Sequence, residues 1–167
     1  CVLGANKMAS YANVASFLSL LAPGSIITSS IPGGAYAAME GTSQAAPHVA
    51  GAWALLKQAE PAMSVNDALA YFRSFGLNVD DTRTGGAVKG MKRVDVAFLA
   101  NPKVGLSVGV SGTGAGTSSV TSLPSGINCT GVATCSGSYY TNASVTLTAT
   151  PGPSVKFAGW GGACTGT

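Results

Sequence analysis

One run of eleven residues, 41–51, contains the side chain of this sequence that is best placed to act as a nucleophile. It reads Gly-Thr-Ser-Gln-Ala-Ala-Pro-His-Val-Ala-Gly, so Ser43 precedes an almost wholly apolar stretch of helical character. The first amides of a helix have no partner within the helix, and the macrodipole places partial positive charge there. The Ser43 hydroxyl, and any oxyanion formed beside it, would lie in a field that favours negative charge. The pattern predicts a nucleophile for acyl transfer; a plain helix N-cap is the alternative.

A serine nucleophile needs a base that accepts its proton. His48 is the only histidine, but five residues at ~100° per residue place it about 140° round the helix axis from Ser43. The two side chains then point to different faces and cannot share a hydrogen bond, so we expect His48 to have a packed or capped role in the core. Four carboxylates after the serine are interpreted as caps, loop residues or surface charges, and none as a member of a catalytic triad: Asp67, Asp80, Asp81 and Asp95.

The elements around Ser43 are expected to be short strands at 2–3 and 25–30 and a helix over 44–58. Apolar residues on nearly every side of this helix predict burial all round. Pro47 is tolerated because its missing amide falls in the first turn. Gly41 is expected to permit a tight turn from strand to helix and the approach of a substrate, whereas Gly51 is interpreted as a packing glycine. Glu40 is interpreted as a solvated carboxylate, with a contact to the leaving-group side of a substrate as the alternative.

A second helix is predicted to begin at Ser64, because Asp67 follows at the spacing of a capping box. Val65, Leu69 and Phe72 recur at i, i+4 and i+7, which indicates one buried stripe that ends at Gly76. Polar, Gly-rich residues 78–90 indicate a loop, and residues 93–100 indicate a last short helix.

The character of the chain changes at residues 101–102, Asn-Pro, after which Gly, Ser and Thr dominate. Apolar residues alternate at 106, 108 and 110 and again at 145, 147 and 149, which is typical of strands with one buried face. Cys129 and Cys135 are close enough to close a small loop, which predicts a disulfide and an oxidising compartment, with two free thiols as the alternative. No Cys or His pair has the spacing of zinc ligands.

The composition limits the classes of function. Charged residues are only 9% of the 167 residues, and the net charge of +3 is spread along the chain. Without a basic cluster interleaved with aromatic residues, nucleic-acid binding is not expected, and no apolar run has the length of a membrane span. The first residue is Cys1, in a predicted strand, which favours a chain whose N-terminal half is missing.

The 41–51 run resembles, nearly residue for residue, the serine signature of the subtilisin-like serine proteases, the subtilases. Leu21-Ala22-Pro23-Gly24, residues 26–30, Tyr36-Ala37-Ala38-Met39-Glu40 and the turn Tyr11-Ala12-Asn13 extend the resemblance over about residues 1–100. It implies the C-terminal portion of an α/β, three-layer domain with a parallel sheet, a serine endopeptidase acting on peptide or protein substrates, and no organic cofactor.

The resemblance also implies that the catalytic Asp, the catalytic His and the side-chain oxyanion donor lie before residue 1. Ser43 would be the nucleophile and its own amide one oxyanion donor, with Thr42 and Gly41 adjacent. Structural calcium occurs in some subtilases, but no acidic loop with suitable ligand spacing is present here. Such a chain, residues 1–167 alone, is expected to be inactive and poorly folded.

Residues 102–167 resemble a small β-repeat module of secreted and cell-surface bacterial proteins. Ile127-Asn128-Cys129, Cys135-Ser136, residues 145–149 and Phe157-Ala158-Gly159-Trp160 followed by Cys164 carry the resemblance, and Cys164 lacks the further cysteine that usually follows. We therefore predict two domains, 1–101 and 102–167, in a secreted or cell-surface protein, with a surface ligand for the second domain. Trp160 and Phe157 are expected to be core aromatics, with a sugar- or surface-binding patch as the alternative. The competing hypothesis for the whole is a non-catalytic adhesion protein with a degenerate protease-like domain.

Overall fold

The structure is a computed structural model that describes residues 2–3, 6–83, 89–131 and 134–164. It divides into two compact units, residues 1–100 (the helical unit) and 101–167 (the β unit), which are described separately. Cys1, which belongs to the first predicted strand, lies outside the described residues.

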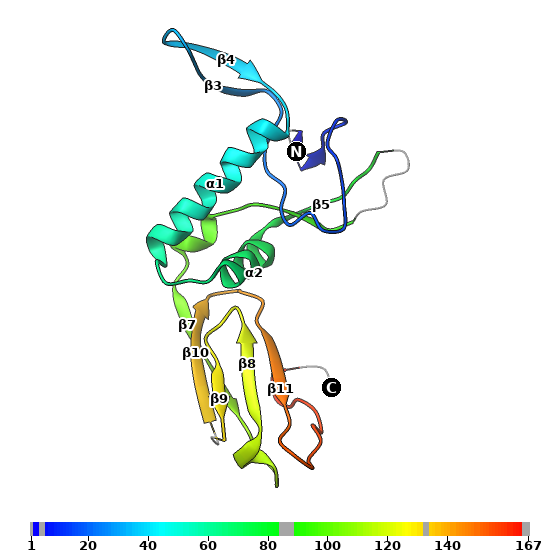
Figure 1. Cartoon of the computed structure of the whole chain (residues 1–167), viewed down its shortest axis with the longest axis vertical. Helices are drawn as coiled ribbons and strands as arrows, with labels where there is room; N and C mark the ends of the chain where they lie inside the picture. Colours follow the sequence, from blue (N-terminus) through cyan, green and yellow to red (C-terminus); the bar gives the residue numbers. More distant parts are fainter. Residues whose placement is uncertain (1, 4–5, 84–88, 132–133, 165–167) are drawn as a thin grey trace. The chain divides into compact units, whose positions relative to one another are not determined.

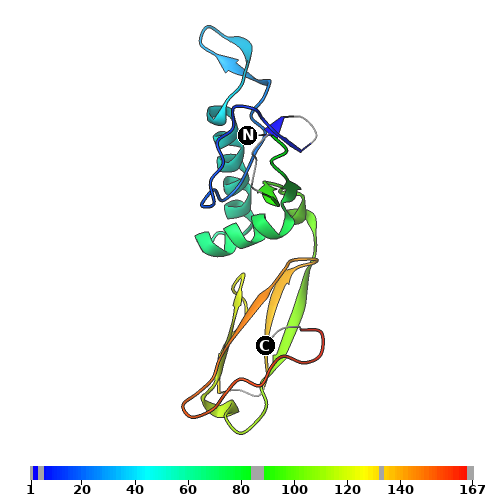
Figure 2. The same ribbon diagram turned by 90° about the vertical axis from the view of Figure 1, so that its right-hand side faces the viewer.

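Among its described residues, the helical unit contains two helices, one 3-10 turn and three small strand pairs, which can be followed in Figure 1. In chain order its elements are β1 (Val2–Leu3), β2 (Lys7–Met8), β3 (Ile27–Ile31), β4 (Ala35–Met39), α1 (Thr42–Ala59), α2 (Val65–Phe75), β5 (Leu77–Val79), β6 (Met91–Arg93) and η1 (Ala97–Ala100). Each of the pairs β1–β2, β3–β4 and β5–β6 is antiparallel. Figure 2 gives the same elements in a second view.

The helix predicted over 44–58 is confirmed and begins two residues earlier, but the prediction that it is buried all round is wrong. Only Ala45, Ala52 and Leu56 are buried, and they lie on one side because their spacing is close to whole turns. Within the described part of the chain, neighbours pack against that side only. Leu55 is half exposed and Gly51 is exposed, with open space where a Cβ would stand, so Gly51 is not a packing glycine here.

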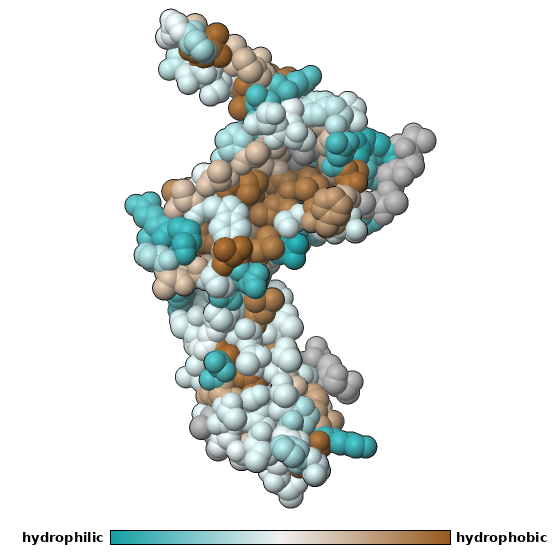
Figure 3. Space-filling model, viewed as in Figure 1, coloured by the Kyte–Doolittle hydropathy of each residue, from teal (hydrophilic) through white to brown (hydrophobic). Residues whose placement is uncertain are grey.

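The visible face of the helical unit gathers hydrophobic residues (Figure 3). The exposed large apolar side chains of this unit are Tyr11, Phe17, Ile26, Tyr36, Met39, Leu55, Val65 and Leu77. Many of the apolar residues that give this chain its low charge content therefore lie at the surface of the helical unit and not in a core.

α2 begins as predicted. The Ser64 hydroxyl accepts a hydrogen bond from the Asp67 amide at 3.1 Å and donates one to the Asp67 carboxylate at 2.7 Å. The expected stripe is partly wrong, because Val65 stands in the exposed first turn and the buried side chains are Asp67, Ala68, Tyr71 and Phe72. The buried face is the one whose aromatic rings, Tyr71 and Phe72, pack against Phe98.

Aromatic rings join α1, α2 and η1 into one packed layer. Phe72 meets Trp53 at 5.4 Å and Phe98 at 6.2 Å between ring centroids, and Phe75 stacks on Phe98 at 4.6 Å. Such pairs stabilise beyond their buried area by about 0.5–1.5 kcal/mol each. The helix predicted over 93–100 shortens to η1, because Arg93 belongs to β6.

The 78–90 segment is not loop throughout, since β5 reaches Val79 and pairs with β6. Leu21 lies beside Arg93 in a single parallel bridge, held by Leu21 N–H to Lys92 O at 2.7 Å and Val94 N–H to Leu21 O at 2.8 Å. This is the one parallel contact among the described strands. The unit therefore mixes helices with short antiparallel strand pairs, and the predicted three-layer domain with a parallel sheet is not present among the residues described.

The β unit consists of two antiparallel sheets with a small shared core. Its elements are β7 (Lys103–Gly109), η2 (Ala115–Thr117), β8 (Ser119–Leu123), β9 (Asn128–Thr130), β10 (Thr134–Tyr140) and β11 (Thr146–Thr150). One sheet has the order β10-β7 and the other β11-β8-β9. The alternation predicted around residues 106–110 and 145–149 is confirmed, because Val108 is buried and Leu106 and Leu147 are half-buried against the core.

The disulfide between Cys129 and Cys135 joins β9 of the larger sheet to β10 of the smaller one. Because the two strands belong to different sheets, the bond links the two sheets covalently. The core between them contains Val108, Val120, Ile127 and Tyr139. The alternative of two free thiols does not hold in this structure. Cys164 has a free thiol.

Candidate active site

Ser43 is the second residue of α1, and its side chain is exposed together with that of Thr42. Gly41 is the N-cap residue, and no side chain caps the helix. In the described part of the chain the Ser43 hydroxyl has no hydrogen-bond partner. The interpretation of Ser43 as a plain N-cap is therefore wrong, and its hydroxyl is open to a ligand.

The backbone amides around Ser43 form a site suited to negative charge. Gln44 and Ala45 N–H donate to the Gly41 carbonyl at 3.2 and 3.3 Å, which closes the first turn. The Thr42 and Ser43 amides precede these bonds, and within the described residues neither finds a backbone acceptor. Unpaired amides at a helix N-terminus attract anions, so an oxyanion next to Ser43 would have a donor in the amide of that residue.

Gly41 has the backbone conformation that the turn into α1 requires. Its φ is +146°, where an L side chain is strained, and a Cβ would stand 3.1 Å from the Gln44 side-chain oxygen. The Gly41 amide donates to the Gly24 carbonyl at 2.8 Å, which ties the entry of the helix to the 22–24 segment. Glu40, one residue earlier, is exposed as expected for a solvated carboxylate.

His48 does not act on Ser43 in this structure. Its Nδ1 lies 2.8 Å from the Gln44 carbonyl oxygen, one turn back in the same helix. The ring is exposed, so the expected packed or capped role in the core is wrong, and the Gln44 carbonyl is the polar partner of its Nδ1. The ring turns to its own helix backbone because that carbonyl is the acceptor within reach on its face.

The four downstream carboxylates occupy the expected cap and loop positions. Asp67 lies in the first turn of α2 on Ser64. Asp80 accepts a hydrogen bond from the Gly90 amide at 2.6 Å, and Asp95 accepts one from the Ala97 amide at 2.8 Å. The last two bonds satisfy backbone donors, Gly90 directly before β6 and Ala97 at the start of η1, and the bond from Asp95 to the amide two residues on is a usual use of Asp.

Asp81 is also a loop residue, but its side chain is only 2% exposed, so it is not a surface charge. Both carboxylate oxygens bind Arg83: Nε donates to Oδ1 and Nη2 to Oδ2, each at 2.7 Å. The Arg83 guanidinium holds the pKa of the Asp81 carboxyl below its ordinary value, and the carboxylate in turn raises the pKa of Arg83. Burial of the carboxylate is tolerated because it is paired and hydrogen-bonded.

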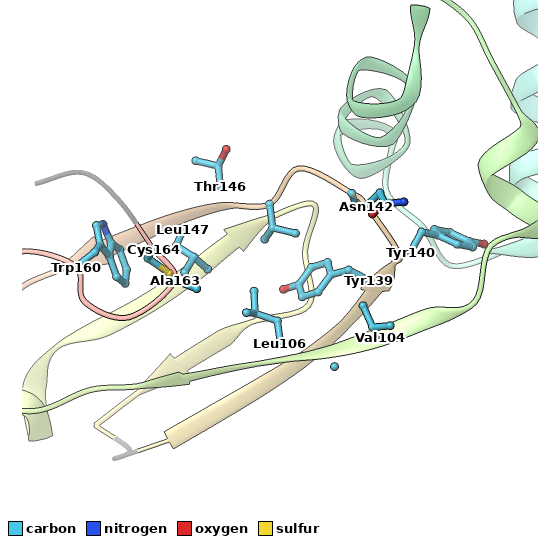
Figure 4. Close-up of a pocket in the computed structure, with 13 residues that line it drawn as sticks. Val104, Leu106, Tyr139, Tyr140, Asn142, Thr146, Leu147, Trp160, Ala163 and Cys164 are labelled. Carbon is cyan, nitrogen blue, oxygen red and sulfur yellow. The ribbon is translucent and has the colours of Figure 1, made fainter.

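The β unit has a pocket of about 580 Å³ that opens between its two sheets (Figure 4). Its aromatic residues are Tyr139, Tyr140 and Trp160, with Leu106 and Leu147 among the aliphatic ones. Trp160 is half-buried against the core and packs edge-to-face on Phe157 with ring centroids 5.0 Å apart. Trp160 is therefore a core aromatic, as expected, whereas Phe157 is 38% exposed at the surface.

Metal and membrane features are reported for the described ranges alone. No three His, Cys, Asp or Glu side chains gather there into a metal-binding group, so we assign calcium ligands to none of them. Neither helix of the described chain combines the length and hydropathy that a bilayer crossing requires.

Comparison with known families adds to this geometry. A profile of the subtilase family (Peptidase S8) matches residues 3–94, which is more than half of the chain. The chain belongs to the subtilase family. The divergent InlB B-repeat domain matches residues 106–167 of this subtilase.

Curated relatives match about a third of the chain. Subtilisin NAT of Bacillus subtilis subsp. natto and a subtilisin of Bacillus pumilus are each 50% identical over 60 residues, 36% of this chain. Subtilisin BL of Lederbergia lenta is 48% identical over 59 residues, 35% of this chain. These matches span only 16% of the first relative and 22% of the other two.

Two residues of this subtilase make long-range contacts that the sequence analysis does not predict. Tyr11 was assigned only to a turn, yet its hydroxyl donates to the Gly24 carbonyl at 2.9 Å. Arg83 was not singled out, yet it donates to three carbonyls near the start of the chain. No local signal could have found these contacts, since Arg83 and its acceptors are 71 to 74 positions apart.

Proposed function

We propose that this chain is the serine-bearing portion of a subtilase-type serine endopeptidase, with Ser43 as its nucleophile. The observation that carries the proposal is the exposed, unengaged Ser43 hydroxyl beside free amides at the start of α1. The 41–51 run and the family match over residues 3–94 support the same assignment. Thr42 and Gly41 adjoin the oxyanion position.

The reaction is the cleavage of a peptide bond through an acyl-enzyme. The Ser43 oxygen attacks the scissile carbonyl carbon and passes its proton to a histidine outside residues 1–167. The tetrahedral oxyanion is stabilised by the Ser43 amide, the carbon–nitrogen bond breaks, and the proton goes to the leaving amine. Water then hydrolyses the ester, which releases the acid and restores the serine hydroxyl. An aspartate, also outside this chain, orients the histidine, as in the triad of subtilisin, whose chain order is Asp, His, Ser.

The remaining features extend this proposal. Residues 1–101 would belong to a three-layer α/β domain whose parallel sheet is completed by residues outside the chain, and residues 102–167 would form a separate β module. We propose a secreted or cell-surface location, because the Cys129–Cys135 disulfide indicates an oxidising compartment. The substrate would be a peptide or protein, and the β module would contact a cell-surface ligand.

A fluorophosphonate probe on the full-length protein tests the nucleophile. We expect stoichiometric labelling that Ser43→Ala abolishes. Ser64→Ala is the matched control, since Ser64 is also a helix-start serine but its hydroxyl is bound to Asp67. Equal labelling of Ser43→Ala and wild type would refute the assignment, as would no labelling of the folded full-length protein.

The second candidate is a non-catalytic surface protein in which the β module does the binding. The match of residues 106–167 to a B-repeat domain favours it. The coding sequence before Cys1 discriminates the two: subtilase Asp and His motifs support the peptidase, and their replacement supports the scaffold.

A further inference from the structure

Arg83 collects backbone carbonyls from a distant turn. Its Nη1 donates to the carbonyl oxygens of Ala9, Ser10 and Ala12 at 3.2, 3.0 and 2.6 Å. Two hydrogens on one nitrogen are thus shared among three acceptors, which requires the 9–12 turn to curl round the guanidinium. The turn also closes on itself, through Ala12 N–H to Ala9 O at 3.0 Å.

Asp81 fixes the other edge of the same guanidinium. The bidentate contact through Nε and Nη2 is joined by the Arg83 amide, which donates to Asp81 Oδ1 at 3.1 Å. A planar guanidinium presents its donors in a rigid fork. With one edge held by a buried carboxylate, the opposite edge has a fixed direction, and the carbonyls of the 9–12 turn must meet it there. We call Arg83, Asp81 and the three backbone carbonyls of the 9–12 turn that Arg83 binds the Arg83 clamp.

The turn held by the clamp reaches the serine through a single carbonyl group. Tyr11, in the middle of the turn, donates its hydroxyl to the Gly24 carbonyl at 2.9 Å and lies 2.6 Å from the Ser25 hydroxyl. The same Gly24 carbonyl accepts the Gly41 amide at 2.8 Å, two residues before Ser43. Both lone pairs of one oxygen therefore join the clamped turn to the entry of α1.

Packing supports the same connection. Ala45, in the first turn of α1, is buried in the cluster that contains Ala9, Ala12 and Ala22. The backbone of Ser43 is thus anchored on both sides, by the Gly41 amide before it and by the Ala45 side chain after it. Both anchors rest on segments that the clamp positions.

We propose that Arg83, Asp81 and Tyr11 are positioning residues for Ser43: they hold the Gly24 carbonyl where it sets the Gly41 backbone and hence the direction of the serine hydroxyl. The inference rests on the proposed function, because positioning has a consequence only where Ser43 reacts. None of the three touches the substrate in this scheme. They act through backbone placement, to which acyl transfer is sensitive at about 1 Å.

The test uses the full-length protein and the variants Arg83→Lys and Tyr11→Phe. Lysine keeps the charge but has no fork to bind Asp81 and the turn together, and phenylalanine keeps the ring but cannot donate to Gly24. Arg73→Lys is the matched control, since Arg73 is exposed at the end of α2. The measurements are kcat and KM for a chromogenic peptide ester, with the active-site concentration titrated by the fluorophosphonate.

We expect kcat per titrated site to fall about tenfold in Arg83→Lys and severalfold in Tyr11→Phe, with KM within twofold of wild type and with Arg73→Lys unchanged. The double variant should lose less than the product of the two single effects, because both residues act through one connection. A merely structural role would lower the number of titrated sites and leave kcat per site at the wild-type value.

Wild-type kcat per titrated site in both variants would overturn the inference and leave the proposed function intact. Tyr11→Phe decides the matter if Arg83→Lys does not fold, since it removes only a hydroxyl. If the wild-type protein is inactive, or Ser43→Ala reacts equally well, the proposed function fails instead and the inference falls with it.

Discussion

Replacing Gly41 by alanine perturbs the entry of α1 at one atom. The φ of +146° lies where L residues are strained, and the added Cβ would meet the Gln44 Oε1 at 3.1 Å. This contact is with the end of a flexible side chain, so the Gln44 side chain can move away at low cost. Backbone strain is the dominant effect, and a residue held in such a region costs about 1–3 kcal/mol.

The protein has two ways to respond, and both affect Ser43. If the backbone keeps its conformation, the strain lowers the free energy of unfolding of the domain by about 1–3 kcal/mol. If φ relaxes, the Gly41 amide leaves the Gly24 carbonyl, now 2.8 Å away, which costs about 1 kcal/mol and turns the serine. A displacement of about 1 Å at a reacting group lowers the rate by about a hundredfold, so we expect kcat to fall more than stability predicts.

The assay is acylation of the full-length protein, measured as burst amplitude and rate, beside thermal unfolding. Gly112→Ala is the control, because Gly112 also has a positive φ, +108°, and a Cβ there meets no atom within 4 Å. It lies in the β unit, so it should cost similar strain without slowing acylation. A Gly41→Ala protein with wild-type stability and wild-type acylation rate would refute the reasoning.

Three further predictions concern stability. Ser64→Ala removes the cap of α2, which should lower the free energy of unfolding by about 1 kcal/mol; an unchanged thermal midpoint would show that the bonds to Asp67 contribute nothing. Asp81 has a pKa below its ordinary 3.8 in the folded protein, so the stability it contributes is present above about pH 4 and is lost as the pH falls through the folded pKa. Urea midpoints between pH 2 and 6 should therefore drop less steeply for Asp81→Asn than for wild type, and parallel curves would contradict the assignment. The disulfide Cys129–Cys135 closes a loop of sequence separation 6, and its reduction should destabilise the β unit by about 2 kcal/mol because of the added entropy of the unfolded chain. The measurement is unfolding with and without reductant, followed by the near-ultraviolet circular dichroism of Tyr139 and its neighbours. Coincident unfolding curves would show that the disulfide does not contribute to stability.

Local features were predictable because their signals lie within a few residues. The cap at Ser64 follows from a hydroxyl three positions before a carboxylate, and the strands of the β unit follow from a period of two. The helix α1 follows from residues 41–58 to within two residues of its start, and so does the place of Ser43 at its entry. In each case, the residues that interact are neighbours along the chain, so their spacing is enough.

Burial was predicted less well, because it depends on what packs against an element. The composition of α1 indicated burial all round, yet in the described chain one face carries Leu56 and the other leaves Leu55 half exposed. Val65 fits a helical stripe but stands in solvent at the helix start. A period shows which residues share a face, and it does not show whether a neighbour covers that face.

The sequence alone determined that this protein carries a serine at a helix entry, in the pattern of one protease family, followed by a β-rich segment with a cysteine pair. Only the tertiary structure decided that Asp81 is buried, that Arg83 holds the carbonyls of the 9–12 turn, and that Tyr11 shares the Gly24 carbonyl with Gly41. The reason is separation along the chain. A guanidinium and its acceptors some seventy residues apart leave no spacing to detect, and they meet only because the folded backbone brings both to one place.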